Sequence, residues 1–465
     1  MRPPHRWAAS VGRQEQSRAA PSPAREAAAA GKSPSREAAC LSLLGPTMNG
    51  GCYLLAWATL CLVGGWATSW HLGRPFTAVW NVPTARCQTH FGQPLLLEPF
   101  GIVHNQAQRF RGQNITIFYK NQLGLYPYLG PRGVLHHGGI PQAVSLHRHL
   151  ALVTSQISGL MHKGFRGLAV LDWEEWHPLW NRNWGPRWIY RKASWSWARQ
   201  QWPDLPPKQR RLEARAAFER AAQALMEGTL QLVRALRPRG LWGFYRFPLC
   251  RSPWWGRHNY TGKCQVVDKA YNDRLRWLWE ASSALFPSIY LPPGLPRIYR
   301  KRYTRHRLEE AFRVARFGHP RPLPVLAYTR LTHLGSGKFL SQSDLVQTIG
   351  VSVALGVEGV VLWGDLSFSS SGEQCKLLQS YLSTILGPYL NNVTRAAQAC
   401  SQQLCHGNGR CVRQDPGNDD AFLHLEPAGA LGTPREDPDR WTHFRCLCYP
   451  GWVGTACKVP VPGTE

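Results

Sequence analysis

Acidic residues are scarce in this sequence of 465 residues. It carries 28 Asp and Glu residues against 55 Lys and Arg residues, which gives a formal net charge of +27. Such an excess attracts polyanions, for example acidic polysaccharides, nucleic acids or anionic membrane surfaces, although a basic surface also serves general solubility. Long apolar runs are lacking as well, because the stretch at residues 53–64 is shorter than the roughly 20 residues of a membrane-spanning helix. We therefore expect no transmembrane segment.

Two further absences narrow the class of protein. No Gly-x-Gly-x-x-Gly pattern follows the first predicted strand at residues 76–81, which weakens a dinucleotide-binding, doubly wound sheet as the architecture. The final residues, VPVPGTE, contain no apolar tail, so we see no signal for a lipid anchor that replaces a C-terminal segment.

Cysteines, in contrast, are abundant. Six of the thirteen lie close together near the C-terminus, at positions 400, 405, 411, 446, 448 and 457, which is typical of an oxidised, extracytoplasmic protein. Three glycosylation sequons agree with this compartment and predict modification of Asn114, Asn259 and Asn392. We expect a secreted or endolysosomal protein, with retention at the cell surface by charge as a further alternative. Nucleic-acid binding is disfavoured.

The N-terminal part divides into two segments. Residues 1–47 are rich in Ala, Ser, Pro and Arg without periodicity, which indicates a disordered or upstream extension, with translation starting at Met48. Residues 48–69 have the apolar run and small residues of a signal peptide cleaved near 67–71. Removal of this part would take away Cys40, Cys52 and Cys61 and leave ten cysteines, an even number.

Short apolar runs alternate with amphipathic segments from residue 70 to 397. The runs lie at residues 76–81, 115–119, 168–174, 241–247, 288–292, 324–331 and 359–365, and helical periodicity is clear at 210–236, 305–315 and 375–386. Apolar strands alternating with helices predict a parallel sheet covered on both faces. Seven or eight units favour a distorted (β/α) TIM-like barrel, an α/β fold, over an open doubly wound sheet.

The positions of the cysteines suggest how this barrel is stapled. Cys87 follows the first predicted strand and Cys375 opens the last helix, so a closed barrel would bring them together. Cys250 and Cys264 could staple the loop after the strand at 241–247. Residues 398–459 have the cysteine spacing of an epidermal-growth-factor-like (EGF-like) module with a long, floppy insert at 412–445, followed by a tail at 460–465. Six cysteines allow fifteen pairings; the usual order of such modules would pair 400 with 411, 405 with 446 and 448 with 457.

The strongest chemical signal is LAVLDWEEW at residues 168–176. Catalytic groups of barrel enzymes lie at the C-terminal ends of strands. Asp172 and Glu174 share one face because side chains alternate along a strand. Two neighbouring carboxyl groups do not ionise independently, and one raised pKa suits a general acid. We expect Glu174 to donate the proton and Asp172 to hold its own proton or orient the substrate; Glu175 points away. Such acids could otherwise cap a turn or pair with arginines.

The closeness of the two acids also constrains a mechanism. Most glycosidases place two carboxylates on opposite sides of the bond they cleave, at least ~5 Å apart. Two acids on one strand lie on the same side. A glycosidase with this pair would therefore take its nucleophile from the substrate, namely the carbonyl oxygen of a 2-acetamido group.

Aromatic and basic residues at other strand ends predict the remainder of a cleft. The aromatic residues are Tyr119, Tyr245, Tyr290, Tyr328 and Trp363. Their rings can cover the apolar faces of sugars while the hydroxyl groups form hydrogen bonds. Arg246, Arg307 and Arg330 could form a positive rim for uronic-acid carboxylates. Each residue taken alone is more often part of the core or of a solvated surface.

Seven separated blocks resemble the vertebrate hyaluronidases, a family of glycoside hydrolases. They are FTAVWNVPT, ITIFYKNQLGLYPY, VLDWEEW, RPRGLWGFYRFP, LFPSIYLP, RHRLEEAFRVA and GVVLWGD, in the same order, and the resemblance spans about residues 70–459. It implies a distorted (β/α) barrel with an EGF-like module, the five disulfides above, and no metal or organic cofactor.

The resemblance also implies an activity. It is the hydrolysis of internal β-1,4 links of hyaluronan, with chondroitin as a weaker substrate, by an endo-β-N-acetylhexosaminidase that acts with substrate-assisted retention, most simply as a monomer. By motif position, Glu174 would be the acid/base, Asp172 its partner and Tyr245 the residue that positions the acetamide. Tyr119, Tyr290, Arg307, Tyr328 and Trp363 would line the groove. Arg246, Leu249 and Leu334 depart from the pattern of active members.

Two function classes follow. The first is an active glycosidase, favoured by the intact Asp172 and Glu174 pair. The second is a weakly active or non-catalytic glycosaminoglycan-binding protein on the same fold, suggested by the net charge, the three departures and the appended module. A pure binding protein has no need of the acid pair, so that pair discriminates between them.

Overall fold

The computed structural model describes residues 74–253, 255–425 and 440–461, all within one compact unit, Ala67–Glu465. The predicted extension at 1–47, the predicted signal peptide at 48–69 and residues 462–465 of the predicted tail lie outside the described residues. Within these ranges no helix is both long and apolar enough to cross a membrane.

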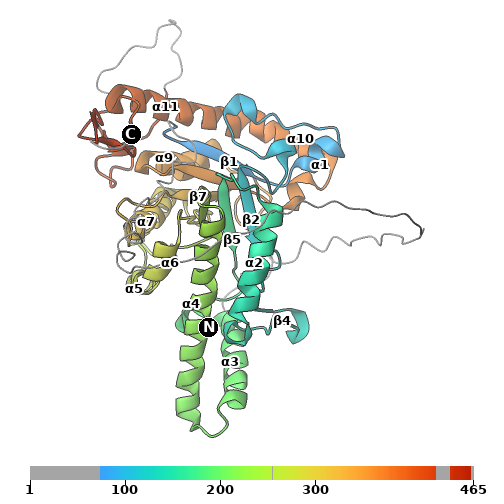
Figure 1. Cartoon of the computed structure of the whole chain (residues 1–465). Coiled ribbons are helices and arrows are strands. Elements are labelled where there is room, and N and C mark those ends of the chain that lie inside the picture. Colours follow the sequence, from blue (N-terminus) through green and yellow to red (C-terminus); the bar gives the residue numbers. More distant parts are fainter. Residues whose placement is uncertain (1–73, 254, 426–439, 462–465) are drawn as a thin grey trace, which may run out of the picture. The chain divides into compact units, whose positions relative to one another are not determined.

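Six parallel strands build the centre of the fold (Figure 1). They form two three-stranded sheets, ordered β2-β5-β6 and β1-β8-β7. The bounds are β1 (Thr77–Asn81), β2 (Ile115–Tyr119), β5 (Leu168–Asp172), β6 (Leu241–Phe244), β7 (Leu326–Arg330) and β8 (Gly359–Trp363). The strands are buried along almost their whole length, as expected for apolar runs covered on both faces.

Irregular segments join the two sheets into a ring. On one side, Phe286 bridges to Tyr245 and Ser288 bridges to Tyr328, so residues 285–288 lie between β6 and β7. On the other side, Val103 pairs with β1, and the Asn105 side chain takes the place of a strand partner for β2. Its Nδ2 donates to the Ile115 carbonyl at 2.8 Å and its Oδ1 accepts from the Ile115 amide at 3.1 Å. The predicted distorted barrel is therefore correct.

The predicted strand at residues 288–292 is wrong. This segment makes single bridges rather than a ladder. Pro287, Pro292 and Pro293 flank or interrupt it, and proline has no amide hydrogen to donate to a strand. Of the other predicted strands, only the one at 115–119 has the expected length. The rest are shorter by one to three residues; for example, β5 ends at Asp172 and β6 ends at Phe244.

Helices cover the outside of the ring, and the long α4 packs against both α2 and α3 (Figure 1). The three predicted helical segments lie in α4, in α7, and in α10 with the turn of π-helix that follows it. The bounds are α1 (Ala85–Thr89), α2 (Leu146–Leu160), α3 (Trp188–Gln201), α4 (Pro207–Leu236), α5 (Val266–Arg274), α6 (Arg276–Ala281), α7 (Arg297–Val314), α8 (Gln342–Leu345), α9 (Val351–Leu355), α10 (Gly372–Tyr381) and α11 (Gly387–Cys405). A small antiparallel pair, β3 (Tyr128–Leu129) and β4 (Leu135–His136), follows β2.

Five disulfides link the pairs that the sequence suggested: Cys87–Cys375, Cys250–Cys264, Cys400–Cys411, Cys405–Cys446 and Cys448–Cys457. The last three hold the C-terminal module, which begins within α11. The module contains two antiparallel pairs, β9 (Gly409–Arg413) with β10 (Phe444–Cys448) and β11 (Trp452–Val453) with β12 (Val459–Pro460).

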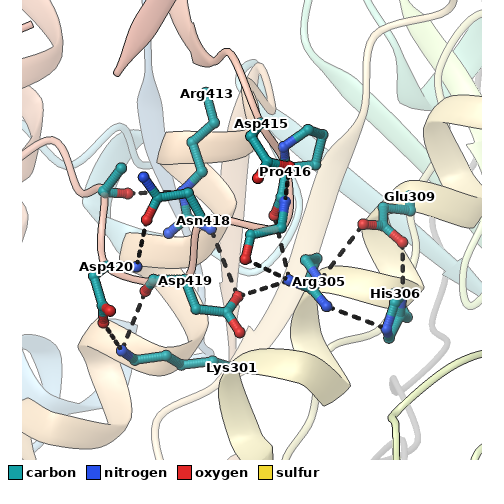
Figure 2. A network of polar contacts seen from close by, with 12 residues as sticks. Lys301, Arg305, His306, Glu309, Arg413, Asp415, Pro416, Asn418, Asp419 and Asp420 are labelled. Carbon is teal, nitrogen blue, oxygen red and sulfur yellow. Dashed lines mark hydrogen bonds and ion pairs between the residues drawn. The ribbon is translucent and has the colours of Figure 1, made fainter. Parts of the chain in front are cut away.

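The module's insert is not a floppy loop in the parts that are described, so that expectation is wrong for 412–425 and 440–445. Asp419 accepts from Arg305 of α7 at 3.0 Å, and Asp420 pairs with Lys301 at 3.1 Å (Figure 2). The Arg413 guanidinium is buried beneath this segment and donates to the Ala421 carbonyl at 2.7 Å. Ion pairs with a basic helix and one buried arginine hold a sequence that looks disordered by composition.

Candidate active site

The acid pair lies where β5 ends. Asp172 is the last residue of the strand and stands beside Tyr119, the last residue of β2. Trp173 turns the other way into the core, where its ring stacks on Tyr126 with centroids 4.7 Å apart. Asp172 and Glu174 therefore leave the strand end on the same side, as the alternation of side chains predicted.

The surroundings of Asp172 favour its protonated form. Burial of the carboxyl group, and then the nearby Glu174, raise the pKa of Asp172 well above its usual value, and the opposing effect of Arg246 is smaller. The Oδ1 atom of Asp172 is buried and has no hydrogen-bond partner among the described residues. This carboxyl group thus has an unused polar atom that a substrate amide could satisfy.

Glu174 is fixed by its backbone and paired by its side chain. Its carbonyl accepts two hydrogen bonds from Arg187, at 3.1 Å from Nε and 2.7 Å from Nη2. Its carboxylate pairs with Nη1 of Arg246 at 2.8 Å, and the two side chains are 30% and 49% exposed. Solvent can therefore reach Glu174, but the Arg246 guanidinium is bound to its carboxylate.

Glu175 belongs to a different cluster. Its carboxylate makes a close ion pair with Lys120 and accepts a hydrogen bond from the Tyr190 hydroxyl at 3.4 Å. Its backbone amide donates to the Tyr126 hydroxyl at 3.2 Å. The three neighbouring acids thus have separate environments, and Glu175 has the structural role that strand alternation suggested.

The five predicted aromatic residues come together in one cluster beside the acid pair. The Tyr245 ring lies 5.0 Å from Tyr328 and 6.1 Å from Tyr290, and Tyr290 stacks on Trp363 at 6.2 Å. The Trp363 indole donates to the Tyr119 hydroxyl at 3.2 Å. Tyr328 is fully buried and forms the floor of the cluster, whereas Tyr119, Tyr245 and Tyr290 are half-buried.

The Tyr245 hydroxyl lies 3.5 Å from the Ser288 hydroxyl, to which it donates. Burial, and then the charge of Glu174, raise the pKa of Tyr245 above its usual value, so this group remains a hydrogen-bond donor. A neutral phenol facing an acid pair is suited to stabilising an oxygen that gains negative character.

The three predicted arginines have different positions. Arg246 pairs directly with Glu174. Arg330 covers the aromatic cluster, with its guanidinium 4.8 Å from the Trp363 ring, and pairs with Asp365 at 3.4 Å. Arg307 lies over Tyr303 at 4.0 Å and donates to the Cys250 carbonyl, so it supports the disulfide-closed loop next to the cluster.

Some residues that shape the site escaped sequence reasoning. Arg187 clamps the Glu174 backbone and Ser288 meets the Tyr245 hydroxyl. Neither stands in a pattern that marks it, because Arg187 lies in an irregular turn and Ser288 in the segment taken for a strand.

The three sequon asparagines differ in environment. Asn259 is exposed. The side-chain amide of Asn114 donates to the His104 carbonyl at 2.6 Å, and that of Asn392 donates to the Leu425 carbonyl at 2.7 Å. Glycosylation at all three stays a prediction. In the part of the chain that is described, no group of three His, Cys, Asp or Glu residues could hold a metal ion.

The chain is similar in sequence and in structure to known proteins. Residues 67–461 match the hyaluronidase family of glycoside hydrolases. The chain is 59% identical to mouse Hyaluronidase-3 over 89% of its own length and 100% of that protein. It is 43% identical to human Hyaluronidase-2 over 83% and 86%. Among solved structures, bee venom hyaluronidase in complex with a hyaluronic acid tetramer matches with a TM-score of 0.62 and 31% identity, covering 68% of this chain and 98% of that one.

Proposed function

Because the chain belongs to the hyaluronidase family of glycoside hydrolases, we propose that it cleaves internal β-1,4 links of hyaluronan, with Glu174 as the proton donor. The observation that carries this proposal is the pair at the end of β5, where Asp172 is buried with a raised pKa and Glu174 faces solvent. Binding of a hyaluronic acid tetramer to the bee venom relative supports the choice of polymer.

The mechanism follows from the side of the sugar on which the acids stand. With both carboxyl groups on one side, the 2-acetamido carbonyl oxygen of the substrate attacks the anomeric carbon from the other. Glu174 gives its proton to the departing glycosidic oxygen, so the C–O bond breaks as the oxazoline-like ring forms. Asp172 and the Tyr245 hydroxyl orient the acetamide. Glu174 then takes a proton from water, which opens the ring with overall retention.

A matched substrate tests this mechanism. The purified protein should shorten high-molecular-weight hyaluronan, and nuclear magnetic resonance should show new reducing ends in the β configuration before they mutarotate. Hyaluronan whose acetyl groups have been removed should resist cleavage, because it lacks the nucleophile. New ends in the α configuration, or equal cleavage of the deacetylated polymer, would rule out substrate assistance.

A second function has one observation in its favour. The Arg246 guanidinium occupies the carboxylate of Glu174 at 2.8 Å, which suits a protein that binds glycosaminoglycan without cutting it. Retention of hyaluronan on the protein with no shortening between pH 3.5 and 7.5 would identify this binding function. Chondroitin would be the weaker ligand or substrate in either case.

The cellular location of the protein is also a proposal. The ten paired cysteines suit the secretory pathway, with secretion, delivery to endolysosomes or retention at the cell surface as end points. Fractionation of cells that express a tagged protein tests this, and detection only in the cytosol would refute it.

A further inference from the structure

Arg246 has an unusual backbone conformation for its residue type. Its φ angle is +70°, in the left-handed region that residues with a side chain seldom adopt. Its amide donates to the Phe286 carbonyl at 2.9 Å, and the amide of Tyr245 donates to the Leu171 carbonyl at 2.9 Å. The backbone is therefore held to both neighbouring segments of the ring, β5 and residues 285–288. A strained residue held by its surroundings next to an acid pair points to a functional role.

The strained backbone delivers the guanidinium to Glu174. The 2.8 Å ion pair is partly exposed on both sides, with Arg246 at 49% and Glu174 at 30%, so an incoming anion can reach it. The guanidinium occupies the Glu174 carboxylate, the group that would have to approach the glycosidic oxygen. The pair must therefore open before Glu174 can act as an acid.

Positive charge exceeds negative charge around this pair. The neighbouring His177 has a pKa well below its usual value because of burial and then the charges of Arg187, Arg246, Arg182 and Arg251. Asp268 neutralises part of this charge, since it is bonded to both Arg182 and Arg251 at 2.6–2.8 Å. Arg187 contacts the Glu174 carbonyl rather than its carboxylate. An additional carboxylate would therefore be attracted to this place.

The proposed substrate brings that carboxylate to the right position. The sugar that departs when an N-acetylglucosaminyl β-1,4 link of hyaluronan breaks is a glucuronate, which leaves through its O4. The carbon next to C4 bears the carboxylate. The oxygen that receives the proton of Glu174 and the carboxylate that can bind Arg246 thus belong to neighbouring carbons of one ring.

We propose that Arg246 is a carboxylate-exchange latch, a specificity residue that pairs with Glu174 in the free protein and with the departing glucuronate in the complex. Binding of glucuronate releases Glu174, which can then take up and donate a proton. A neutral sugar at the same place leaves the latch closed. The inference rests on the proposed function, and it adds that selection of an acidic polymer occurs at the catalytic acid itself.

Cleavage of two matched polymers tests the latch. Arg246→Gly removes the guanidinium, and glycine adopts a positive φ without strain, so the variant should fold. The substrates are hyaluronan and carboxyl-reduced hyaluronan, in which glucose replaces glucuronate. The wild type should prefer native hyaluronan, and Arg246→Gly should lower that preference about fivefold, the size expected for one partly exposed ion pair. Turnover of the reduced polymer should rise in the variant.

Arg132→Gly is the matched control. Arg132 is also an arginine with a positive φ, +58°, and it is exposed on the turn before β4, so the control should keep the wild-type preference. If Arg246→Gly slows both polymers equally, or leaves both unchanged, the latch is wrong.

A binding cycle separates failure of the latch from failure of the proposed function. Calorimetry would compare the affinity for hyaluronan octasaccharide of the wild type, Glu174→Gln, Arg246→Gly and the double variant. A latch predicts that Glu174→Gln binds about threefold to fivefold more tightly than the wild type, and that this gain vanishes without Arg246. A gain that persists without Arg246, no gain, or no binding by any of the four proteins overturns the latch. If the cycle holds while no protein cuts hyaluronan, only the proposed hydrolysis fails.

Discussion

At the scale of single residues, the environment of each carboxyl group separates three acids that are almost adjacent in sequence. Asp172 is desolvated and has a raised pKa, Glu174 faces solvent and Arg246, and Glu175 is paired with Lys120. Strand alternation was sufficient to predict which two acids share a side. It could not predict which of the two has the raised pKa, because that depends on burial and on arginines from distant segments.

Asp172 should make stability depend on pH. Its pKa is raised in the folded protein, so the folded state binds more protons than the unfolded state above about pH 4, the ordinary value for Asp. The contribution is fully present below that pH and is lost as pH rises towards the folded pKa. Thermal unfolding between pH 4 and 8 should therefore show a smaller fall in Tm for Asp172→Asn than for the wild type. Parallel curves would mean that Asp172 ionises normally.

Tyr245 should act through its hydroxyl rather than its ring. Tyr245→Phe keeps the ring contacts with Tyr328 and Tyr290 but removes a neutral donor beside the acid pair. A donor aimed at charge that develops in the transition state contributes about 100-fold in kcat. Steady-state kinetics on hyaluronan should show this loss in kcat with little change in KM. A change confined to KM would assign Tyr245 to binding alone.

At the scale of elements, apolar runs predicted the strands well and their ends poorly. All six strands lie within predicted runs, and α4 and α7 contain two of the predicted helices. The failures have a physical cause. Residues 288–292 have the composition of a strand but carry prolines around them, and the closure of the ring depends on the Asn105 side chain, which no periodicity marks. In both cases the structure depends on contacts between segments that are distant in the sequence.

A disulfide that encloses a longer stretch of chain should stabilise more, with the logarithm of the enclosed length. Cys250–Cys264 spans 14 residues and Cys87–Cys375 spans 288. The loop-entropy relation assigns about 3 kcal/mol to a loop near the shorter length and about 6 kcal/mol to the longer one. Denaturant unfolding of the two double Cys→Ala variants should therefore show the larger loss of unfolding free energy when the barrel ends are unlinked. The reverse order would show that local strain or residual structure outweighs chain entropy.

At the scale of the whole molecule, charge complementarity ties the C-terminal module to the barrel. A basic helix, α7, faces acidic residues of the module's insert (Figure 2). Composition alone had suggested that this insert would be disordered. Net charge could not reveal the contact, because it does not show that Asp419 and Asp420 meet Arg305 and Lys301.

Two neighbouring aspartates give a controlled test of this contact. Asp419 is 25% exposed and meets Arg305, which is 13% exposed, whereas Asp420 is 92% exposed. Asp419→Asn should lower the unfolding free energy by about 1 kcal/mol, and Asp420→Asn should change it little, because solvent screens exposed pairs. Chemical denaturation at low and high salt would measure both, and added salt should reduce the difference. Equal effects of the two substitutions would mean that the contact does not stabilise the fold.

The central claim is that Glu174 is the acid of a hyaluronan hydrolase, and a comparison of adjacent acids tests it most directly. The measurement is the chain length of hyaluronan after incubation with the wild type, Glu174→Gln or Glu175→Gln from pH 3.5 to 7.5. We predict that Glu174→Gln slows shortening by about 100-fold to 10,000-fold, the range for loss of a general acid, whereas folded Glu175→Gln retains activity. Equal shortening by the wild type and Glu174→Gln would contradict the account.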